Sequence, residues 1–293
     1  MKIVVTIPAY NEGRKIGDVV SRVKKVMKGK KYNFKILVVD DGSRDSTASA
    51  AKEAGAIVYS NPVNLGLAET FRIEIRKCLE LGAELIVHID ADGQYLPEEI
   101  PKLIDKFKEG YDLVLGSRFV GTIEHMPWLK RWGNKAFSRV ISSIIKHKIT
   151  DCQTGFRVFS KKVAQSIDII SDHTYTQEQI IKAIRGGFKA VEVGVYFAKR
   201  KGRSRLLKNP LEYAVKAWVN LFRIYRDYKP LKFFGIFGFW MVFFGVLIGL
   251  YFLVLHFSTG IRGHTGLLFL MLLLFFVGIQ VILFGFLADM IKR

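Results

Sequence analysis

The sequence contains very few cysteines, and the two present, Cys78 and Cys152, stand far apart with no Cys-x-x-Cys pair. Neither a disulfide framework nor a structural zinc site is therefore indicated, and a reducing compartment fits this usage. The first residues also lack the long apolar run of a signal peptide, because Pro8 interrupts it. We expect this segment to form the first strand of a fold.

Acidic residues are scarce in one part of the chain. The 293 residues contain 45 Lys+Arg and 26 Asp+Glu, which gives a formal net charge of +19. Residues 1–118 hold 19 basic and 17 acidic side chains, residues 119–232 hold 23 and 8, and residues 233–293 hold 3 and 1. The basic middle is followed by an almost uncharged, apolar end. This order excludes a wholly soluble protein and favours a membrane surface over nucleic acid as the partner.

Two runs have no charged residue at all, 233–255 and 266–288. At about 1.5 Å per residue, each is long enough to cross the roughly 30 Å hydrocarbon core of a bilayer as a helix. Buried helices of a soluble protein are the alternative, but two such runs in tandem without a polar face disfavour it. The short connection, residues 256–265, predicts a tight hairpin that leaves residues 1–232 and the C-terminal tail on the same side.

Basic residues flank this hairpin. Lys229 and Lys232 precede the first run, and Lys292 and Arg293 follow the second, whereas Arg262 alone among lysines and arginines lies in the connection. The positive-inside rule then places the flanking side in the cytoplasm. We expect an integral membrane protein whose N-terminal domain and both termini are cytoplasmic.

Strand-like and helix-like runs alternate in the first part of the chain. The strand-like runs are residues 3–7, 36–39, 57–59 and 85–89, and the helix-like runs are 13–28, 44–54 and 66–81. This alternation predicts an α/β fold with a mostly parallel, Rossmann-like sheet. Polar clusters follow the first, second and fourth predicted strands, at Asn11-Glu12, Asp40-Asp41-Gly42-Ser43 and Asp90-Ala91-Asp92-Gly93-Gln94. Ligands bind beyond the carboxyl ends of such strands, so we expect the site there.

Two basic stretches, 127–148 and 210–228, carry apolar residues at helical spacing. The apolar residues of the first are Trp128, Leu129, Trp132, Phe137, Val140, Ile141, Ile144 and Ile145. Both stretches suit helices that lie in the headgroup layer of a membrane. The alternative is that they pack on the globular domain and expose their charged faces to water. Their occurrence together near a membrane anchor favours the interface.

Asp90 and Asp92 end a predicted strand, so both carboxylates can reach over its carboxyl edge toward one ligand. A hard divalent cation such as Mg²⁺ or Mn²⁺ takes oxygen ligands and is usually shared between one or two carboxylates and substrate phosphates. Gln94 offers a further neutral oxygen. Asp pairs also close ordinary turns, but the second acidic loop at Asp40-Asp41 favours the metal site.

Seven motifs occur in one order along the chain. They are Pro8-Ala9-Tyr10-Asn11-Glu12, Val38-Val39-Asp40-Asp41-Gly42-Ser43, Asn64-Leu65-Gly66, Asp90-Ala91-Asp92-Gly93-Gln94, Gly116-Ser117-Arg118, Asp151-Cys152-Gln153-Thr154-Gly155-Phe156-Arg157 and Lys201-Gly202-Arg203-Ser204-Arg205. The series resembles the family 2 glycosyltransferases with the GT-A fold. Its last two motifs resemble the polyprenyl-phosphate branch, typified by dolichyl-phosphate mannose and glucose synthases.

The resemblance spans residues 3 to about 206 and implies the domain organisation. A GT-A domain would occupy residues 1–206 and include the 127–148 interface helix. An amphipathic juxtamembrane helix at 207–232 and the transmembrane hairpin at 233–293 would follow.

The resemblance also implies roles on the donor side. Nucleotide binding falls to Pro8, Ala9, Tyr10, Glu12, Asp40, Asn64, Asp90 and Ala91. Asp92 and Gln94, together with Asp90, would hold the cation that bridges the donor diphosphate. Tyr10 and Glu12 can also lie in the first turn of a helix, since a carboxylate is stabilised by the positive end of a helix dipole. The two interpretations are compatible.

The acceptor side needs fixed cations, because a lipid phosphate has to approach a diphosphate. Guanidinium groups bind phosphate oxygens bidentately. We therefore expect acceptor-phosphate contacts from Arg118, Arg131, Arg203 and Arg205. By the resemblance, Glu178 belongs to the sugar and acceptor pocket. Arg157 is placed there as well, with an internal ion pair to Asp151 or Glu178 as its alternative. The expected catalytic residues are Asp92 and Arg118.

The implied reaction is attack by a lipid-phosphate oxygen on the anomeric carbon of a nucleotide-activated sugar, with inversion and release of nucleoside diphosphate. That oxygen is already anionic near neutral pH, so catalysis rests on positioning and charge stabilisation, and Asp92 is not required as a base. The motif wording favours UDP-glucose or a UDP-N-acetylhexosamine over GDP-mannose as the donor, by analogy.

Other functions are less consistent with the sequence. A processive polysaccharide synthase would carry a Gln-x-x-Arg-Trp motif, which does not occur, and more than two apolar spans. A membrane-anchored nucleotide-sugar binding protein without catalysis would not need the acidic motif and the arginines together. Nucleic-acid binding is disfavoured because the aromatic residues lie beside apolar spans. Assembly into a homo-oligomer is left open.

Overall fold

The computed structural model describes residues 1–170, 175–199, 219, 222–258 and 263–291. The chain forms two compact units, Met1–Ala214 and Val215–Arg293. Arg203, Arg205 and most of the 207–232 stretch lie outside the described residues.

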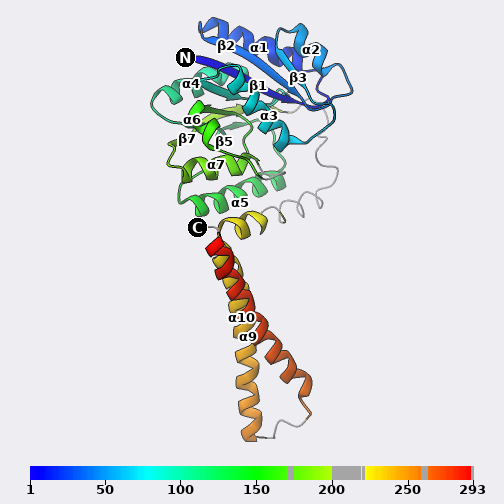
Figure 1. The fold of residues 1–293 in the computed structure, drawn as a ribbon, viewed down its shortest axis with the longest axis vertical. Coiled ribbons are helices and arrows are strands. Elements are labelled where there is room, and N and C mark those ends of the chain that lie inside the picture. The colour runs from blue at the N-terminus through cyan, green and yellow to red at the C-terminus, as the bar shows by residue number, and fades with distance from the viewer. Residues whose placement is uncertain (171–174, 200–218, 220–221, 259–262, 292–293) are drawn as a thin grey trace. The chain divides into compact units, whose positions relative to one another are not determined.

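In the described part of the first unit, seven strands form one sheet (Figure 1). They are β1 (Lys2–Ala9), β2 (Asn33–Asp40), β3 (Ile57–Ser60), β4 (Leu85–His88), β5 (Leu113–Ile123), β6 (Arg157–Ser160) and β7 (Ala190–Phe197). Their order is β3-β2-β1-β4-β6-β5-β7, and β6 runs antiparallel to both of its neighbours. The predicted mostly parallel sheet is confirmed.

The direction in which the chain adds strands to the sheet reverses at β1. β2 pairs with one side of β1, from Lys2 opposite Asn33 to Ala9 opposite Asp40, and β4 pairs with the other side. All three strands are parallel, so their carboxyl ends meet at one edge of the sheet. This edge is a topological switch point, where ligands bind in open α/β folds.

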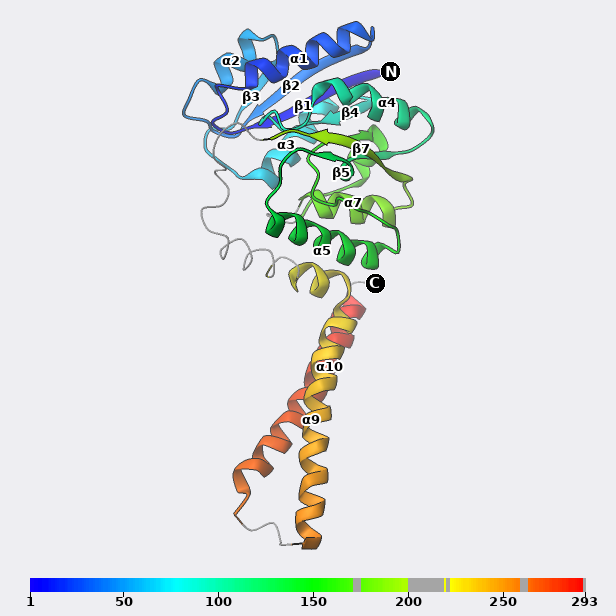
Figure 2. The ribbon, with the colours of Figure 1, turned by 180° about the vertical axis from the view of Figure 1, so that it is seen from behind.

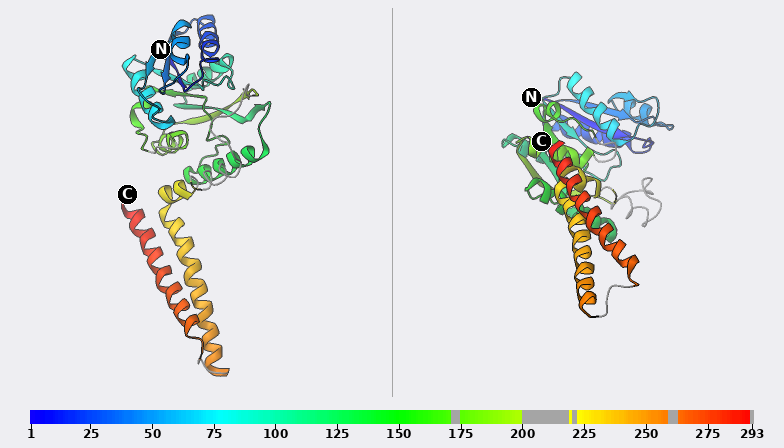
Figure 3. Two further views of the ribbon diagram at one scale, coloured as in Figure 1. Left: turned by 90° about the vertical axis from the view of Figure 1, so that its right-hand side faces the viewer. Right: turned by 60° about the horizontal axis from the view of Figure 1, so that its bottom comes forward.

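Helices cover both faces of the sheet. One face carries α1 (Ile16–Gly29), α2 (Thr47–Glu53), η1 (Pro97–Glu99) and α4 (Ile100–Lys108), and the other carries α3 (Leu67–Glu80), α6 (Lys161–Ser166) and α7 (Tyr175–Arg185). Figures 2 and 3 show α1 on the opposite side of the sheet from α7. The first three helices begin one to three residues later than the sequence pattern predicts, and every predicted helix over residues 13–81 is present.

Alternation along β1 explains how the two faces differ. Ile3, Val5 and Ile7 belong to the apolar core shared with α1, because successive strand residues point to opposite faces. Thr6 points to the other face, where its hydroxyl donates to Glu74 of α3 at 3.0 Å. The α1 side of the sheet is therefore apolar along β1, whereas the α3 side combines apolar residues such as Val4 and Phe71 with the buried Thr6–Glu74 pair.

Helix α5 (Trp128–Ile145) packs against α7 and has two different faces. Phe137, Ile141 and Ile144 are buried within the first unit, so they do not face a membrane as the sequence pattern suggested. Trp128 and Trp132 are 75% and 70% exposed on the opposite face. One side of α5 therefore packs on the globular domain, and the opposite side is available for a membrane interface.

The second unit is a hairpin of two apolar helices, α9 (Pro230–Ser258) and α10 (Thr265–Ile291), which lie side by side (Figures 1 and 2). Each contains one predicted span, and length and composition suit both for crossing a membrane. Glycines seven residues apart line their contact, Gly238 and Gly245 on α9 and Gly278 and Gly285 on α10. A Cβ on Gly278 would lie 2.8 Å from Val242 Cγ2, so the close approach depends on glycine.

Candidate functional site

An acidic turn follows β4 at the carboxyl edge of the sheet. Asp92 Oδ1 accepts a hydrogen bond from the Gln94 amide at 3.0 Å, and Gly93 between them has a φ of +73°. The Gln94 side chain donates through Nε2 to the Ala198 carbonyl at 3.0 Å, and the Gln94 carbonyl accepts from the Ala198 amide at 2.9 Å. The turn is therefore fixed to the residue that follows β7.

The Asp90 carboxylate lies close to that of Asp92 and is partly buried. Burial raises the pKa of Asp90 to about 6, and the negative charge of Asp92 adds to the rise. Two carboxylates that repel each other favour a divalent cation between them, and Mg²⁺ and Mn²⁺ prefer oxygen ligands. Gln94 has its amide nitrogen engaged, which leaves Oε1 as an acceptor. Asp90, Asp92 and Gln94 therefore fit a cation that shares its remaining ligands with substrate phosphates.

Gly155, from the motif at residues 151–157, packs directly on Asp90. A Cβ built on Gly155 would overlap the Asp90 carboxylate and lie only 2.5 Å from Asp90 Cγ. The motif thus needs a glycine here because the carboxylate rests on its backbone. In the sequence, this glycine is visible only as part of the motif at residues 151–157, without a predicted role.

The loops after β1 and β2 are braced against each other. The Asn11 amide donates to Ser43 Oγ at 2.8 Å, and Asn11 Oδ1 accepts from the Arg44 amide at 2.8 Å. The Glu12 amide donates to Thr47 Oγ1 at 2.8 Å. These bonds hold the predicted donor-binding loop at the sheet edge.

The predicted donor residues differ in exposure. Pro8, Ala9, Ala91 and Asp40 are buried, Glu12 is partly buried, and Tyr10 and Asn64 are exposed. The Glu12 carbonyl accepts from the Ile16 amide at 3.0 Å, so this residue also begins the first turn before α1. Tyr10 and Glu12 therefore stand where a ligand at this edge would reach them.

Asp41 organises the third loop of the edge and was missing from the predicted site. Its Oδ1 accepts from Asn61 Nδ2 at 3.0 Å and from the Leu65 amide at 2.8 Å, and its Oδ2 accepts from the Gly66 amide at 3.0 Å. Asp40 makes one local bond, from the Ser43 amide at 3.2 Å. The resemblance assigned Asp40 alone to the nucleotide, and nothing in the sequence of two adjacent acids shows which one binds the neighbouring loop.

Arg118 lies where β5 loses its register with β7, between Ser117 and Thr122. This irregularity turns the side chain inward, and Nε and Nη2 donate to the two carboxylate oxygens of Asp151, each at 2.7 Å. Arg118 Nη1 makes no hydrogen bond to any residue that the structure describes. The pair is buried, and Nη1 keeps donors for an anion.

Arg157 is fully buried, and its donors are used within the protein. Nε donates to the Thr154 carbonyl at 2.8 Å, and Nη1 donates to Gln179 Oε1 at 2.8 Å. Neither alternative ion pair occurs among the described residues, because Asp151 pairs with Arg118 and Glu178 pairs with Lys182. Burial lowers the pKa of Arg157. These contacts give Arg157 a role in joining the motif to α7, without a donor directed at a phosphate.

Glu178 of α7 points toward the segment that precedes that helix. Its Oε1 accepts from the Ile170 amide at 3.1 Å and lies 2.8 Å from Lys182 Nζ. Its carboxylate is nearly buried in these contacts. The described contacts of Glu178 are thus with Ile170 and Lys182.

Of the remaining predicted arginines, only Arg131 belongs to the described residues. Arg131 lies on the exposed face of α5, next to Trp132. Arg203 follows Ala198 by five residues in the sequence, and it lies with Arg205 outside the described residues.

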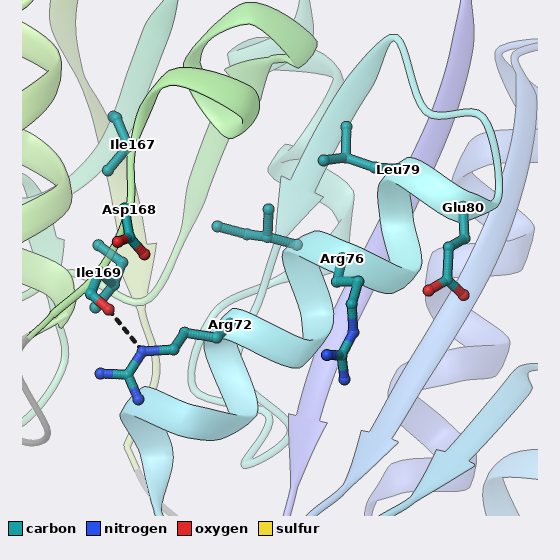
Figure 4. Close-up of a pocket in the computed structure, with 8 residues that line it drawn as sticks. Arg72, Arg76, Leu79, Glu80, Ile167, Asp168 and Ile169 are labelled. Atoms are coloured by element: carbon teal, nitrogen blue, oxygen red, sulfur yellow. Dashed lines mark hydrogen bonds between the residues drawn. The ribbon is translucent and has the colours of Figure 1, made fainter.

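A cavity of about 360 Å³ opens elsewhere, between α3 and residues 167–169 (Figure 4). Ile75, Leu79, Ile167 and Ile169 supply apolar lining, and Arg72 donates to the Ile169 carbonyl at 2.6 Å. None of the residues that line it belongs to the predicted site. The acidic turn, not this cavity, gathers the predicted chemistry.

Comparisons with known proteins agree with this geometry. Residues 4–168 match the model of glycosyl transferase family 2, so the chain belongs to that family. It is 31% identical to a polyprenol monophosphomannose synthase of Mycolicibacterium smegmatis, over 68% of this chain and 78% of that protein. It is 32% identical to a UDP-N-acetylglucosamine--dolichyl-phosphate N-acetylglucosaminyltransferase of Methanococcus voltae, over 54% of this chain and 69% of that protein.

A solved structure shares the fold. It is glucosyl-3-phosphoglycerate synthase from Mycobacterium tuberculosis in complex with Mn²⁺, uridine-diphosphate and phosphoglyceric acid. The TM-score is 0.58 with 18% sequence identity, over 76% of this chain and 77% of that chain. The likeness confirms the predicted fold class.

Proposed function

We propose that the protein transfers a sugar from a nucleoside-diphosphate sugar to the phosphate of a polyprenyl or dolichyl phosphate, with inversion and with a divalent cation in the site. The observation that carries the proposal is the pair of carboxylates, Asp90 and Asp92, at the switch point of the sheet. Family membership and relatives named for polyprenol and dolichyl phosphate support the acceptor class.

The donor is assigned to the edge built by the loops after β1, β2 and β4. Tyr10, Glu12, Asp40 and Asn64 are available there for the nucleotide, together with the backbone of Pro8, Ala9 and Ala91. Asp90, Asp92 and Gln94 would hold the cation against the diphosphate. When bound, the cation stabilises the charge that develops on the leaving diphosphate.

The acceptor phosphate is assigned to the opposite side of the acidic turn. Arg118 offers Nη1, while Asp151 holds Nε and Nη2 of the same guanidinium in place. A phosphate oxygen forms the bond to the anomeric carbon as the bond from that carbon to the diphosphate oxygen breaks. The oxygen carries no proton, so no base is assigned. Arg131, Arg203 and Arg205 are proposed to attract the anionic headgroup.

The membrane arrangement follows from charge and apolar surface. The hairpin is proposed to anchor the protein, with Lys229 and Lys232 on the cytoplasmic side. Trp128 and Trp132 of α5 are proposed to enter the headgroup layer, since both are exposed beside Arg131 and Lys135. This would bring the catalytic unit to the surface where a lipid phosphate is found.

The donor sugar is proposed to be glucose or an N-acetylhexosamine carried on UDP. The relative from Methanococcus voltae, named for UDP-N-acetylglucosamine, supports this choice. The relative named for phosphomannose supports GDP-mannose as the second candidate.

The test uses the full chain in liposomes that contain polyprenyl phosphate, with Mn²⁺ or Mg²⁺ and labelled UDP-glucose, UDP-N-acetylglucosamine or GDP-mannose. A labelled glycolipid with one donor is expected. Product on a glycan acceptor only would indicate a polysaccharide synthase instead, and no product with any donor would contradict catalysis. Asp92→Asn should abolish product with the fold retained, whereas Asp18→Asn, an exposed carboxylate on α1, should retain it.

A further inference from the structure

His88 is a buried imidazole that the proposed mechanism does not use. It is the last residue of β4, two residues before Asp90, and its side chain is 0% exposed. Its Nε2 lies 3.2 Å from Glu74 Oε2 of α3, and its Nδ1 lies 2.6 Å from the Gly155 carbonyl oxygen. A carbonyl oxygen only accepts, so Nδ1 carries the proton of that hydrogen bond.

Several side chains fix the orientation of this ring. Phe71 meets it edge-on with centroids 5.5 Å apart, and Tyr175 of α7 lies 6.0 Å away. Glu74 is itself held, because its Oε1 accepts from Thr6 at 3.0 Å. The imidazole therefore has one arrangement, with Nε2 toward α3 and Nδ1 toward Gly155.

The peptide groups of Gly155 are consequently fixed at both ends of the residue. The Gly155 amide donates to Tyr95 Oη at 3.3 Å, and the Gly155 carbonyl accepts from His88. The Asp90 carboxylate rests on the Cα of this residue, where a Cβ would overlap it. His88 thus contacts the surface on which Asp90 rests, without contacting a ligand.

We propose that His88, oriented by Glu74, is a positioning residue for Asp90. Its Nδ1–H holds the Gly155 carbonyl, and Gly155 holds the carboxylate in the place from which it binds the cation. The expected effect of His88 on sugar transfer rests on the proposed function. Its expected effect on cation affinity rests only on the contacts described above. Partners of metal ligands of this kind change metal affinity or activity by about 10–100-fold when they are removed.

Two substitutions separate positioning from a merely structural role. The side-chain amide of asparagine places a donor where Nδ1 of histidine lies, and that of glutamine places one where Nε2 lies. His88→Asn therefore keeps the bond to Gly155 and loses Glu74, whereas His88→Gln keeps the contact with Glu74 and loses Gly155. Both remove the same buried ring.

The experiment measures Mn²⁺ binding by electron paramagnetic resonance in the presence of UDP, transfer kinetics and thermal unfolding, for the full chain in detergent. We expect His88→Gln to lose about 10-fold or more in Mn²⁺ affinity and in kcat, with His88→Asn within about 3-fold of wild type and both variants similarly destabilised. Equal losses in the two variants, or losses that follow thermal stability alone, would overturn the proposal.

The same data keep the two proposals apart. If wild type transfers no sugar, the proposed function fails, and the order of Mn²⁺ affinities still decides the role of His88. If wild type is active and the two variants are equally active, only the role of His88 fails. Should both variants unfold, Glu74→Leu provides the second measurement, because it removes the carboxylate that orients the ring and should lower Mn²⁺ affinity by about 10-fold. An affinity within about 3-fold of wild type at unchanged thermal stability would overturn the proposal.

Discussion

Arg118 and Asp151 form a two-pronged ion pair that is closed to solvent, with side-chain exposures of 6% and 0%. The carboxylate also accepts from the Arg118 amide at 3.0 Å, so it binds both the side chain and the backbone of β5. The arginine expected to meet the acceptor phosphate is therefore also part of the interior.

Removing one member of this pair leaves the other charge buried without a partner. Asp151→Ala should lower the free energy of unfolding of the first unit by about 3–5 kcal/mol. Urea unfolding followed by near-ultraviolet circular dichroism checks it. Asp105→Ala is the control, because its carboxylate is exposed beside Lys108 and should change stability by less than about 1 kcal/mol. Equal effects in the two variants would contradict the assignment.

Cation binding should weaken as pH falls through about 6, the raised pKa that burial gives Asp90. Below this pH the carboxyl is neutral, and above it is charged, so the proton competes with the cation. At pH 5 the Mn²⁺ affinity should be about 10-fold lower than at pH 8. Calorimetric titration across this range measures it. Asp90→Asn should bind weakly with no step near pH 6, and a step that persists there would assign the titration to another group.

Gly155→Ala should strongly reduce sugar transfer, because the new Cβ would overlap the Asp90 carboxylate. A displacement of about 1 Å in a catalytic group can cost on the order of 100-fold in rate. Steady-state kinetics test this expectation. Gly29→Ala is matched to it in chemistry, lies at the end of α1 with nothing within 4 Å of the new Cβ, and should leave the rate unchanged.

The exposed tryptophans of α5 should matter only for a membrane-bound acceptor. Trp128→Ser combined with Trp132→Ser should raise the KM for long-chain polyprenyl phosphate about 10-fold, since two aromatic anchors are lost. The KM for a short, water-soluble acceptor should stay the same. Val120→Ser, an exposed apolar residue of β5, serves as the control. Equal changes with both acceptors would place the effect in the domain rather than at the membrane.

The glycine contact of the hairpin should not tolerate a large side chain. Gly278→Leu should move α10 away from α9 by about 2 Å, because Val242 Cγ2 already lies 2.8 Å from a built Cβ. Electron–electron double resonance between spin labels at positions 243 and 276 measures this separation. Gly235→Leu has nothing within 4 Å of its Cβ and should leave the distance unchanged.

Local patterns predicted the parts of the fold that depend on local physics. The alternating runs over residues 3–89 correspond to β1 through β4 with their helices, because strand and helix periods are visible in sequence. The antiparallel β6 was not predicted, since its four buried residues carry no sign of direction. The two faces of α5 were likewise hidden, because apolar residues surround the helix and only packing decides which are covered.

In the site, too, local features were predicted and long-range contacts were not. The acidic turn was found because its residues are consecutive and follow a strand. The partner of Arg118 was not found, because Asp151 lies 33 residues away and competed with other pairings in the sequence. His88 is fully buried within β4. Its link to Gly155 joins residues 67 apart, which no local spacing reveals.

The glycines that line the contact between α9 and α10 let the two backbones approach closely, since a Cβ built on Gly238 would lie 2.6 Å from the Gly278 carbonyl oxygen. A hairpin of this kind can hold an enzyme at a bilayer, but two helices in contact do not by themselves enclose a channel for a hydrophilic sugar. On the proposed function, the glycolipid remains in the leaflet where it is made. Its transfer to the opposite leaflet would then be the work of a separate translocating protein.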